Sequence, residues 1–171
     1  MRTPKFAGQL TIRGMLMLLG TMWLAPAALA ITFEPVGTDR GLDAQVISSV
    51  LIDRQGFLWV GSREGLFRYD GYRAIRFTPE PGNPDSITDA DIRTVYESPD
   101  GIIWVATNSG GLNRFDPETG RFTAFRHDSA RSDSLSNDSV YGMVQAEDNK
   151  LWVGTQAGLN LLDTSNGSAR R

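Results

Sequence analysis

Cysteine is absent from this 171-residue sequence, and histidine occurs once, as His127. The missing cysteine excludes disulfides, cysteine-ligated zinc, thiol catalysis and lipid attachment at a cysteine. One histidine cannot form a histidine-clustered metal site, and no convincing Ser-His-Asp set can be assembled. His127 follows a predicted strand in a polar linker, where a histidine is typically a solvated surface residue. The sequence therefore offers no catalytic residues.

Long hydrophobic runs are scarce as well. The apolar stretch Met15–Leu24 is about ten residues long, whereas a helix that spans a bilayer needs about twenty. Basic residues precede this stretch, and the small residues of Ala28-Leu29-Ala30 suit a cleavage site. Residues 1–30 therefore have the pattern of a secretory signal peptide, which predicts export to the periplasm.

Excess positive charge is also lacking. The 17 Lys and Arg face 20 Asp and Glu, and removing the three basic residues of 1–30 leaves 14 against 20, a net charge near −6. This balance disfavours nucleic acid as a partner. Two acidic linkers could offer oxygen ligands to calcium: Asp85, Asp89 and Asp91, and Asp128, Asp133 and Asp138. Neither has the spacing of a calcium-binding loop, so we interpret them as polar linkers and expect no metal and no cofactor.

The main feature of the sequence is an internal repeat. Trp59, Trp104 and Trp152 each stand in a Leu/Ile-Trp-Val-Gly/Ala segment, at spacings of 45 and 48 residues. A Gly-Leu segment ending in aspartate follows each time, at Gly65–Asp70, Gly111–Asp116 and Gly158–Asp163. A repeat of this length matches one propeller blade of roughly 40 to 50 residues. We therefore predict an all-β fold of propeller blades, each with four antiparallel strands.

The frame of the repeat has a structural interpretation. We expect the three tryptophans to fill the space between neighbouring blades, with each indole N–H bonded locally. The aspartates Asp70, Asp116 and Asp163 should accept hydrogen bonds from backbone N–H groups about two residues on. Gly65, Gly111 and Gly158 belong to the same frame. Gly56, Gly101 and Asn149 occupy equivalent hairpin turns, where positive φ is expected.

Alignment on the tryptophans divides the chain into blades at 39–83, 84–131 and 132–171. Residues 31–38, with Phe33 and Val36, form a candidate strand that would close the ring by completing its last blade. About three blades cannot close a propeller, which uses about four to eight. We expect the third blade to stop at Arg171 before its fourth strand, and the chain to be the N-terminal part of a larger ring of about seven blades.

The segment Leu151–Thr155 followed by Gly158-Leu159-Asn160, together with Ser134–Ser136 and Asp116–Phe122, resembles the two-component regulator propeller repeat. The likeness covers nearly all of the sequence after residue 30, with Ala106 in the glycine position as one departure. In that family the repeats form the periplasmic sensor of inner-membrane proteins whose cytoplasmic output is a histidine kinase or a diguanylate cyclase. The resemblance implies a membrane-anchored, homodimeric parent with its output enzyme outside this sequence.

The turns between the second and third strands are the candidate ligand-binding positions. Successive strands run antiparallel, so these turns share one end of the blades with the linkers. In a closed propeller they would surround one mouth of its central channel. The turn residues Arg63, Glu64, Asn108, Ser109 and Gln156 vary while the frame around them stays fixed, as on a repeat scaffold that presents a recognition surface. The alternative interpretation is that they are tolerant turn positions.

These observations predict the ligand-binding sensor segment of a signalling protein, and the resemblance implies polysaccharide fragments as a ligand class. Two alternatives remain open. One is a stand-alone periplasmic propeller enzyme that resembles the streptogramin lyases. The other is a protein-interaction propeller without an output.

Overall fold

The computed structural model describes residues 38–147 and 149–171. The predicted signal peptide (1–30) and all but the last residue of the predicted ring-closing strand (31–38) lie outside these ranges. The elements are, in chain order, η1 (Thr38–Arg40), β1 (Ile47–Ile52), β2 (Leu58–Ser62), β3 (Leu66–Tyr69), β4 (Ala74–Phe77), β5 (Ile92–Glu97), β6 (Ile103–Thr107), β7 (Leu112–Asp116), β8 (Arg121–Phe125), β9 (Val140–Glu147), β10 (Lys150–Thr155), β11 (Gly158–Asp163) and β12 (Ala169–Arg170).

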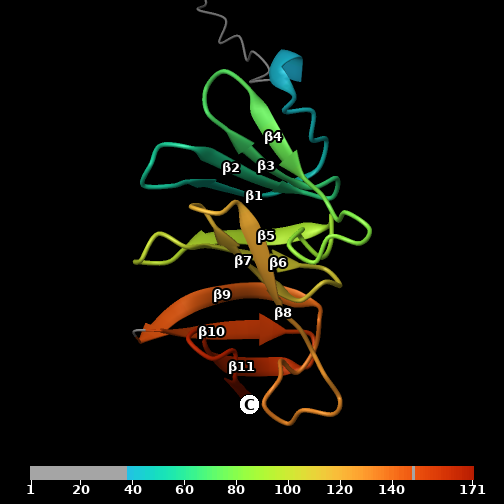
Figure 1. The fold of residues 1–171 in the computed structure, drawn as a ribbon, viewed down its shortest axis with the longest axis vertical. Coiled ribbons are helices and arrows are strands. Elements are labelled where there is room, and N and C mark those ends of the chain that lie inside the picture. The colour runs from blue at the N-terminus through green and yellow to red at the C-terminus, as the bar shows by residue number, and fades with distance from the viewer. Residues whose placement is uncertain (1–37, 148) are drawn as a thin grey trace, which may run out of the picture. The chain divides into compact units, whose positions relative to one another are not determined.

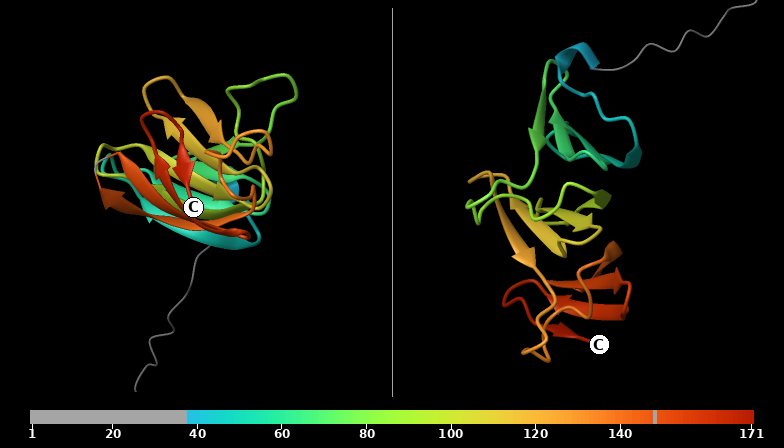
Figure 2. Two further views of the ribbon diagram at one scale, coloured as in Figure 1. Left: turned by 90° about the horizontal axis from the view of Figure 1, so that it is seen from below. Right: turned by 90° about the vertical axis from the view of Figure 1, so that its right-hand side faces the viewer.

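The strands form three separate antiparallel sheets, β1–β4, β5–β8 and β9–β12, each in sequential order (Figure 1). We call them blades 1, 2 and 3. The inner strand β1 contacts β5, and β5 contacts β9, so successive blades pack through their first strands. Figure 2 shows the same succession of sheets from two further directions. The predicted all-β fold of four-stranded propeller blades is confirmed.

Each blade begins with a hairpin whose turn requires positive φ. Gly56 and Gly101 have φ of 88° and 86°, and Asn149, the equivalent residue of blade 3, has φ of 59°. Glycine adopts this region without strain, and asparagine tolerates it better than most residues. Glycine and asparagine therefore recur at this repeat position because the turn has positive φ there.

The core lies between neighbouring blades. Trp59 of β2 is 1% exposed, and its ring centroid lies 5.2 Å from that of Phe115, in blade 2. Phe77 and Phe122 belong to the same cluster. Trp104 occupies the equivalent place in the next interface, where it packs with residues of blade 3 that include Leu135. Side chains alternate along a strand, so each tryptophan points toward the following blade while the adjacent valine points the other way.

Apolar side chains are exposed to solvent on the two outer faces of this set of blades. Val50 of β1 is 65% exposed, whereas Val95, its equivalent in β5, is 7% exposed because blade 1 covers it. Trp152 of β10 is 41% exposed, in contrast to Trp59 and Trp104. Val50 and Trp152 are thus exposed at positions whose equivalents are buried by a neighbouring blade.

The end of blade 3 differs from the prediction that the chain stops before a fourth strand. Ala169 pairs with Leu162 and Arg170 pairs with Leu161, so β12 is a fourth strand of two residues. The turn before it repeats the Asp116–Gly120 turn of blade 2, since the Gly167 N–H donates to the Asp163 carbonyl at 2.8 Å as the Gly120 N–H does to Asp116. The sequence 168–171 lacks the large apolar residues of β8, but the turn, the buried Ala169 and the bond from its backbone N–H to the Asp133 carbonyl at 2.7 Å hold this short strand in place.

In the described ranges, no helix has the length and apolar character needed to cross a bilayer.

Candidate functional site

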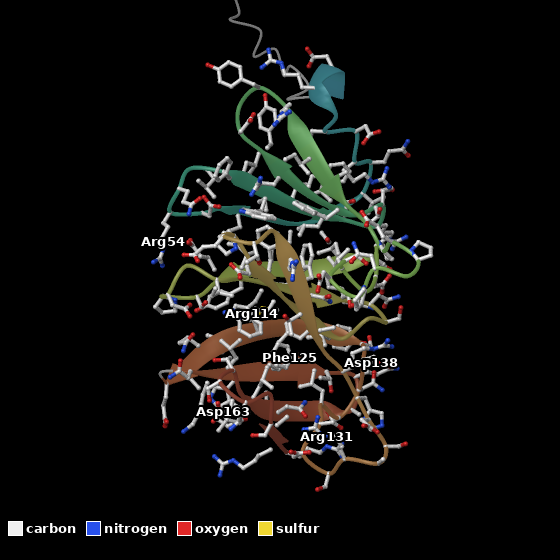
Figure 3. The ribbon with its side chains drawn as sticks, in the orientation of Figure 1. Arg54, Arg114, Phe125, Arg131, Asp138 and Asp163 are labelled. Atoms are coloured by element: carbon white, nitrogen blue, oxygen red, sulfur yellow. The ribbon has the colours of Figure 1, made fainter. Side chains whose placement is uncertain are left out.

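The turns between the second and third strands meet the interblade linkers at one end of the blades, which we call the linker end. The backbone N–H of Asn108 donates to the Asp91 carbonyl at 2.9 Å, and that of Gln156 donates to the Ser139 carbonyl at 2.9 Å. The opposite, hairpin end carries the turns between strands one and two and between strands three and four. In Figure 3, Arg54 marks the hairpin end and Asp138 the linker end.

Buried asparagines hold the linkers against the second and third blades. The Nδ2 of Asn113 donates to the Thr88 hydroxyl and that of Asn160 to the Ser136 hydroxyl, each at 2.8 Å, and both asparagines are fully buried. Each Oδ1 accepts the backbone N–H of the same linker residue. These bonds hold the linker backbone beside the turns.

The predicted ligand-binding residues of blade 1 have different environments. Arg63 is exposed. Glu64 is half-buried, and its carbonyl accepts from Arg76 Nε at 2.9 Å. The Oε2 atom of Glu64 is shielded from solvent and has no hydrogen-bond partner among the described residues. A carboxylate oxygen in this state is costly, and such costs are typically found where function requires them.

The predicted residues of blade 2 form side-chain hydrogen bonds, whereas that of blade 3 is exposed. Both the backbone N–H and the hydroxyl of Ser109 donate to Asp89 Oδ2, at 2.7 and 2.8 Å. The Oδ1 of Asn108 accepts a hydrogen bond from Nη2 of Arg93. Gln156 is exposed. Arg63, Ser109 and Gln156 are thus exposed, and the side chains of Asn108 and Ser109 are bonded to Arg93 and Asp89.

Two residues that the sequence analysis missed lie at β-bulges of the inner strands. The register shifts between Ile92 and Thr94 in β5, and at the equivalent place in β9, which leaves Arg93 and Tyr141 as the extra residues. The Arg93 guanidinium carbon lies 4.6 Å from the centroid of the Tyr141 ring, a cation–π distance. A bulge redirects a side chain, and here it brings together residues 48 positions apart in sequence.

Arg93 is the unusual member of this cluster. Its Nε is buried without a partner among the described residues, and within these ranges it forms no ion pair. Tyr141 beside it is 51% exposed. Its Nη2 already donates to Asn108, but no carboxylate of the described ranges pairs with this guanidinium, so its remaining Nη N–H groups can donate to an incoming oxygen-rich ligand. In the aligned repeats this bulge position holds Ser48, Arg93 and Tyr141, a variation between apolar neighbours that could have marked it from the sequence.

The frame residues lie in local hydrogen-bond networks. The Trp59 indole N–H donates to Asp53 Oδ2 at 2.7 Å, and that of Trp104 donates to Ser98 Oγ at 3.2 Å. Gly111 has φ of 82°, and a Cβ there would lie 2.3 Å from the carbonyl oxygen of Phe125, so the third strand can pass β8 only with glycine. Gly65 and Gly158 occupy the equivalent turns of the other blades, with φ of 147° and 114°.

The three repeat aspartates cap their turns. The backbone N–H groups of Arg73 and Tyr72 donate to Asp70 and lower the pKa of its carboxyl group. The pKa of Asp116 is lowered by the backbone N–H of Glu118, and that of Asp163 by the hydroxyl and backbone N–H of Ser165. All three carboxylates therefore favour the ionised form that accepts these bonds.

The remaining polar candidates have linker roles. His127 Nδ1 lies 2.8 Å from the Leu135 carbonyl oxygen, so the ring donates within the linker between β8 and β9. Asp138 pairs with Arg126 at 2.8 Å, Asp133 with Arg131 at 3.1 Å, and Asp85 with Arg121 at 3.4 Å. Within 38–147 and 149–171, no three acidic or histidine side chains gather closely enough to hold a metal ion.

Comparison with known proteins identifies the repeats. The family model of the two-component regulator propeller matches residues 41–64, 86–109 and 134–157. The chain is 34% identical over 112 residues to a protein of Formosa agariphila named histidine kinase P4, an alignment that covers 64% of this chain and 8% of that protein. The chain thus spans less than a tenth of that relative.

Solved structures agree with this result. The extracellular domain of BT3049 from Bacteroides thetaiotaomicron, described as a hybrid two-component system, superposes with a TM-score of 0.74 and 30% identity, over 81% of this chain and 20% of that one. Virginiamycin B lyase from Staphylococcus aureus superposes with a TM-score of 0.54 at 18% identity, over 73% of this chain and 40% of the lyase, which shows a shared fold alone. Three matched repeats, each folded as one blade, establish that this chain belongs to the two-component regulator propeller family.

Proposed function

We propose that this chain is the periplasmic, ligand-sensing propeller segment of a membrane-anchored two-component signalling protein, and that ligand binds at the linker end. Its likeness to the extracellular domain of a hybrid two-component system supports the sensor role. The observation that carries the position of the site is Arg93, a half-buried guanidinium stacked on Tyr141 with its Nε unpaired in the described ranges.

The ligand class that best suits this cluster is a polysaccharide fragment. Arg93 offers N–H donors to hydroxyl or carboxylate oxygens, and the exposed Tyr141 ring offers an apolar surface beside them. Arg63 and Gln156, exposed at neighbouring turns, add polar groups that differ from blade to blade. A surface of this kind can distinguish ligands without any change in the fold beneath it.

Signalling would follow from differential binding. A ligand shifts a homodimeric parent between two arrangements only if it binds one of them more tightly than the other. The output would come from a histidine kinase or a diguanylate cyclase elsewhere in the parent, beyond an inner-membrane helix. The asparagine-anchored linkers join neighbouring blades, so a ligand that contacts them can alter how blades pack.

The test is the variant Arg93→Ala in the full-length parent. We expect ligand-dependent output and glycan binding to weaken about 10- to 100-fold, as for loss of a charge-assisted contact of about 1.5–3 kcal/mol. Arg73→Ala is the matched control, because Arg73 is an exposed arginine in the turn between β3 and β4 at the hairpin end. Equal glycan binding by both variants would refute the proposed site. Conversion of the glycan to a product by this chain would favour a propeller enzyme.

A further inference from the structure

The hairpin ends of blades 1 and 2 are joined by one arginine. Arg54, in the turn between β1 and β2, has its Nε 2.8 Å from Glu97 Oε1, at the end of β5. Its Nη2 also donates to the Ser98 carbonyl at 3.1 Å. Figure 3 shows Arg54 at the hairpin end of blade 1. Its guanidinium therefore occupies the gap between the hairpins of the two blades.

The interface between blades 2 and 3 lacks this bridge. In the gapless alignment upstream of the tryptophans, Pro99 stands in the position of Arg54, and Gln145 stands in the position of Glu97. The proline ring cannot reach across to the next blade, and the glutamine carries no charge. A cavity of about 270 Å³ lies at this place, lined by Pro99 and Gln145 among others.

The core side chains of this interface are also smaller. Phe115 and Phe122 pack around Trp59 in the first interface, whereas their equivalents around Trp104 are Leu162 and Ala169. Trp104 and Leu151 form the apolar part of the cavity lining.

The polar part of the lining holds one carboxylate, Asp100, whose Oδ1 accepts the Ser98 hydroxyl, together with amide and hydroxyl groups that both donate and accept hydrogen bonds. Asp100, at the rim, is exposed and forms no ion pair with any residue in the described ranges. The Nε2 of Gln145 donates to the Glu147 carbonyl, which leaves the Oε1 of that amide as an acceptor. Asn149 and Thr164 complete the rim. One carboxylate without an ion-pair partner in the described ranges, set beside an apolar wall, suits a cation on an aliphatic stem.

We propose that this cavity is a binding site for a guanidinium group on an aliphatic stem, supplied by a small molecule or by an arginine of a partner protein. The guanidinium would take the place that Arg54 fills in the neighbouring interface, with Asp100 and Gln145 as acceptors. The cavity is smaller than the about 300–1,000 Å³ usual for drug-sized ligands, which fits one side-chain-sized group. It lies at the hairpin end, so it is independent of the site proposed above.

The experiment is a calorimetric titration of the full chain with butylguanidinium, compared with butylurea, which has the same shape but no charge. We expect butylguanidinium to bind at least about 10-fold more tightly, because only it forms charge-assisted bonds. Asp100→Asn should weaken butylguanidinium about 10-fold. Glu118→Gln, which removes an exposed carboxylate from the turn after β7, should leave it unchanged.

A second variant fills the cavity from within. Pro99→Arg combined with Gln145→Glu recreates the Arg54–Glu97 pair, so it should abolish binding of butylguanidinium and raise the melting temperature. Equal binding of the two probes by the unmodified chain, or undiminished binding by this double variant, would overturn the proposal. A titration with acetyl-Gly-Arg-Gly-amide separates the sources: tighter binding of the peptide indicates a partner protein, and tighter binding of butylguanidinium indicates a small molecule.

Discussion

Replacement of Trp59 by alanine tests the packing between blades most directly. Trp59 is 1% exposed and contacts aromatic rings of two blades, with centroids 5.2 Å away at Phe115 and 6.0 Å away at Phe77. Truncation of a buried tryptophan costs about 3–5 kcal/mol through lost contacts and the cavity left behind. Asp53 would also lose the indole N–H that it accepts at 2.7 Å, which leaves a buried carboxylate oxygen short of one donor at a cost of about 1–3 kcal/mol.

Trp152→Ala is the internal comparison, because Trp152 has the same place in its blade but is 41% exposed. With about three-fifths of the side chain's surface buried, its loss should cost ~1–2 kcal/mol. Urea unfolding of the full chain, followed by far-UV circular dichroism, measures both free energies. The midpoint should fall much further for Trp59→Ala than for Trp152→Ala. A cost for Trp152→Ala equal to or above that of Trp59→Ala would refute the assignment of these tryptophans as interblade packing residues.

Three further predictions concern local structure. The pKa values of Asp70, Asp116 and Asp163 are lowered in the folded chain, so each carboxylate stabilises the fold above its unfolded pKa of about 3.9. This stabilisation is lost as the pH falls through the lower folded pKa. The melting temperature should therefore fall less steeply between about pH 5 and 2 for the triple Asp→Asn variant than for the unmodified chain. Gly111→Ala should destabilise the chain by more than about 2 kcal/mol, because its Cβ would collide with the Phe125 carbonyl. Gly71 has φ of 94°, and no atom of the described residues lies within 4 Å of the position that a Cβ would occupy there, so Gly71→Ala should cost only about 1–2 kcal/mol in the same urea assay. Arg54→Ala should lower the unfolding free energy by about 1 kcal/mol through loss of the partly exposed Glu97 pair, and a loss below about 0.2 kcal/mol would show that this bridge does not hold the hairpins together.

Much of the candidate site was predictable in position but not in role. The turn residues Asn108 and Ser109 do lie at the linker end, because strand direction alternates along each blade. Their side chains bond to Arg93 and Asp89, which are 15 and 20 residues away in sequence. No pattern within one repeat predicts such pairs, because the partner depends on how a bulge turns its side chain.

The sequence by itself determined the blades of this protein. Strand alternation, hairpin glycines and turn aspartates act over a few neighbouring residues, so a repeat such as 39–83 specifies its own strands and turns. Tertiary structure decided the features that arise from contacts between two blades. It buries Trp59 and Trp104 but not Trp152, stacks Arg93 on Tyr141, and leaves a cavity where Pro99 replaces an arginine. These outcomes follow from the volumes and charges that meet across an interface, which no single repeat contains.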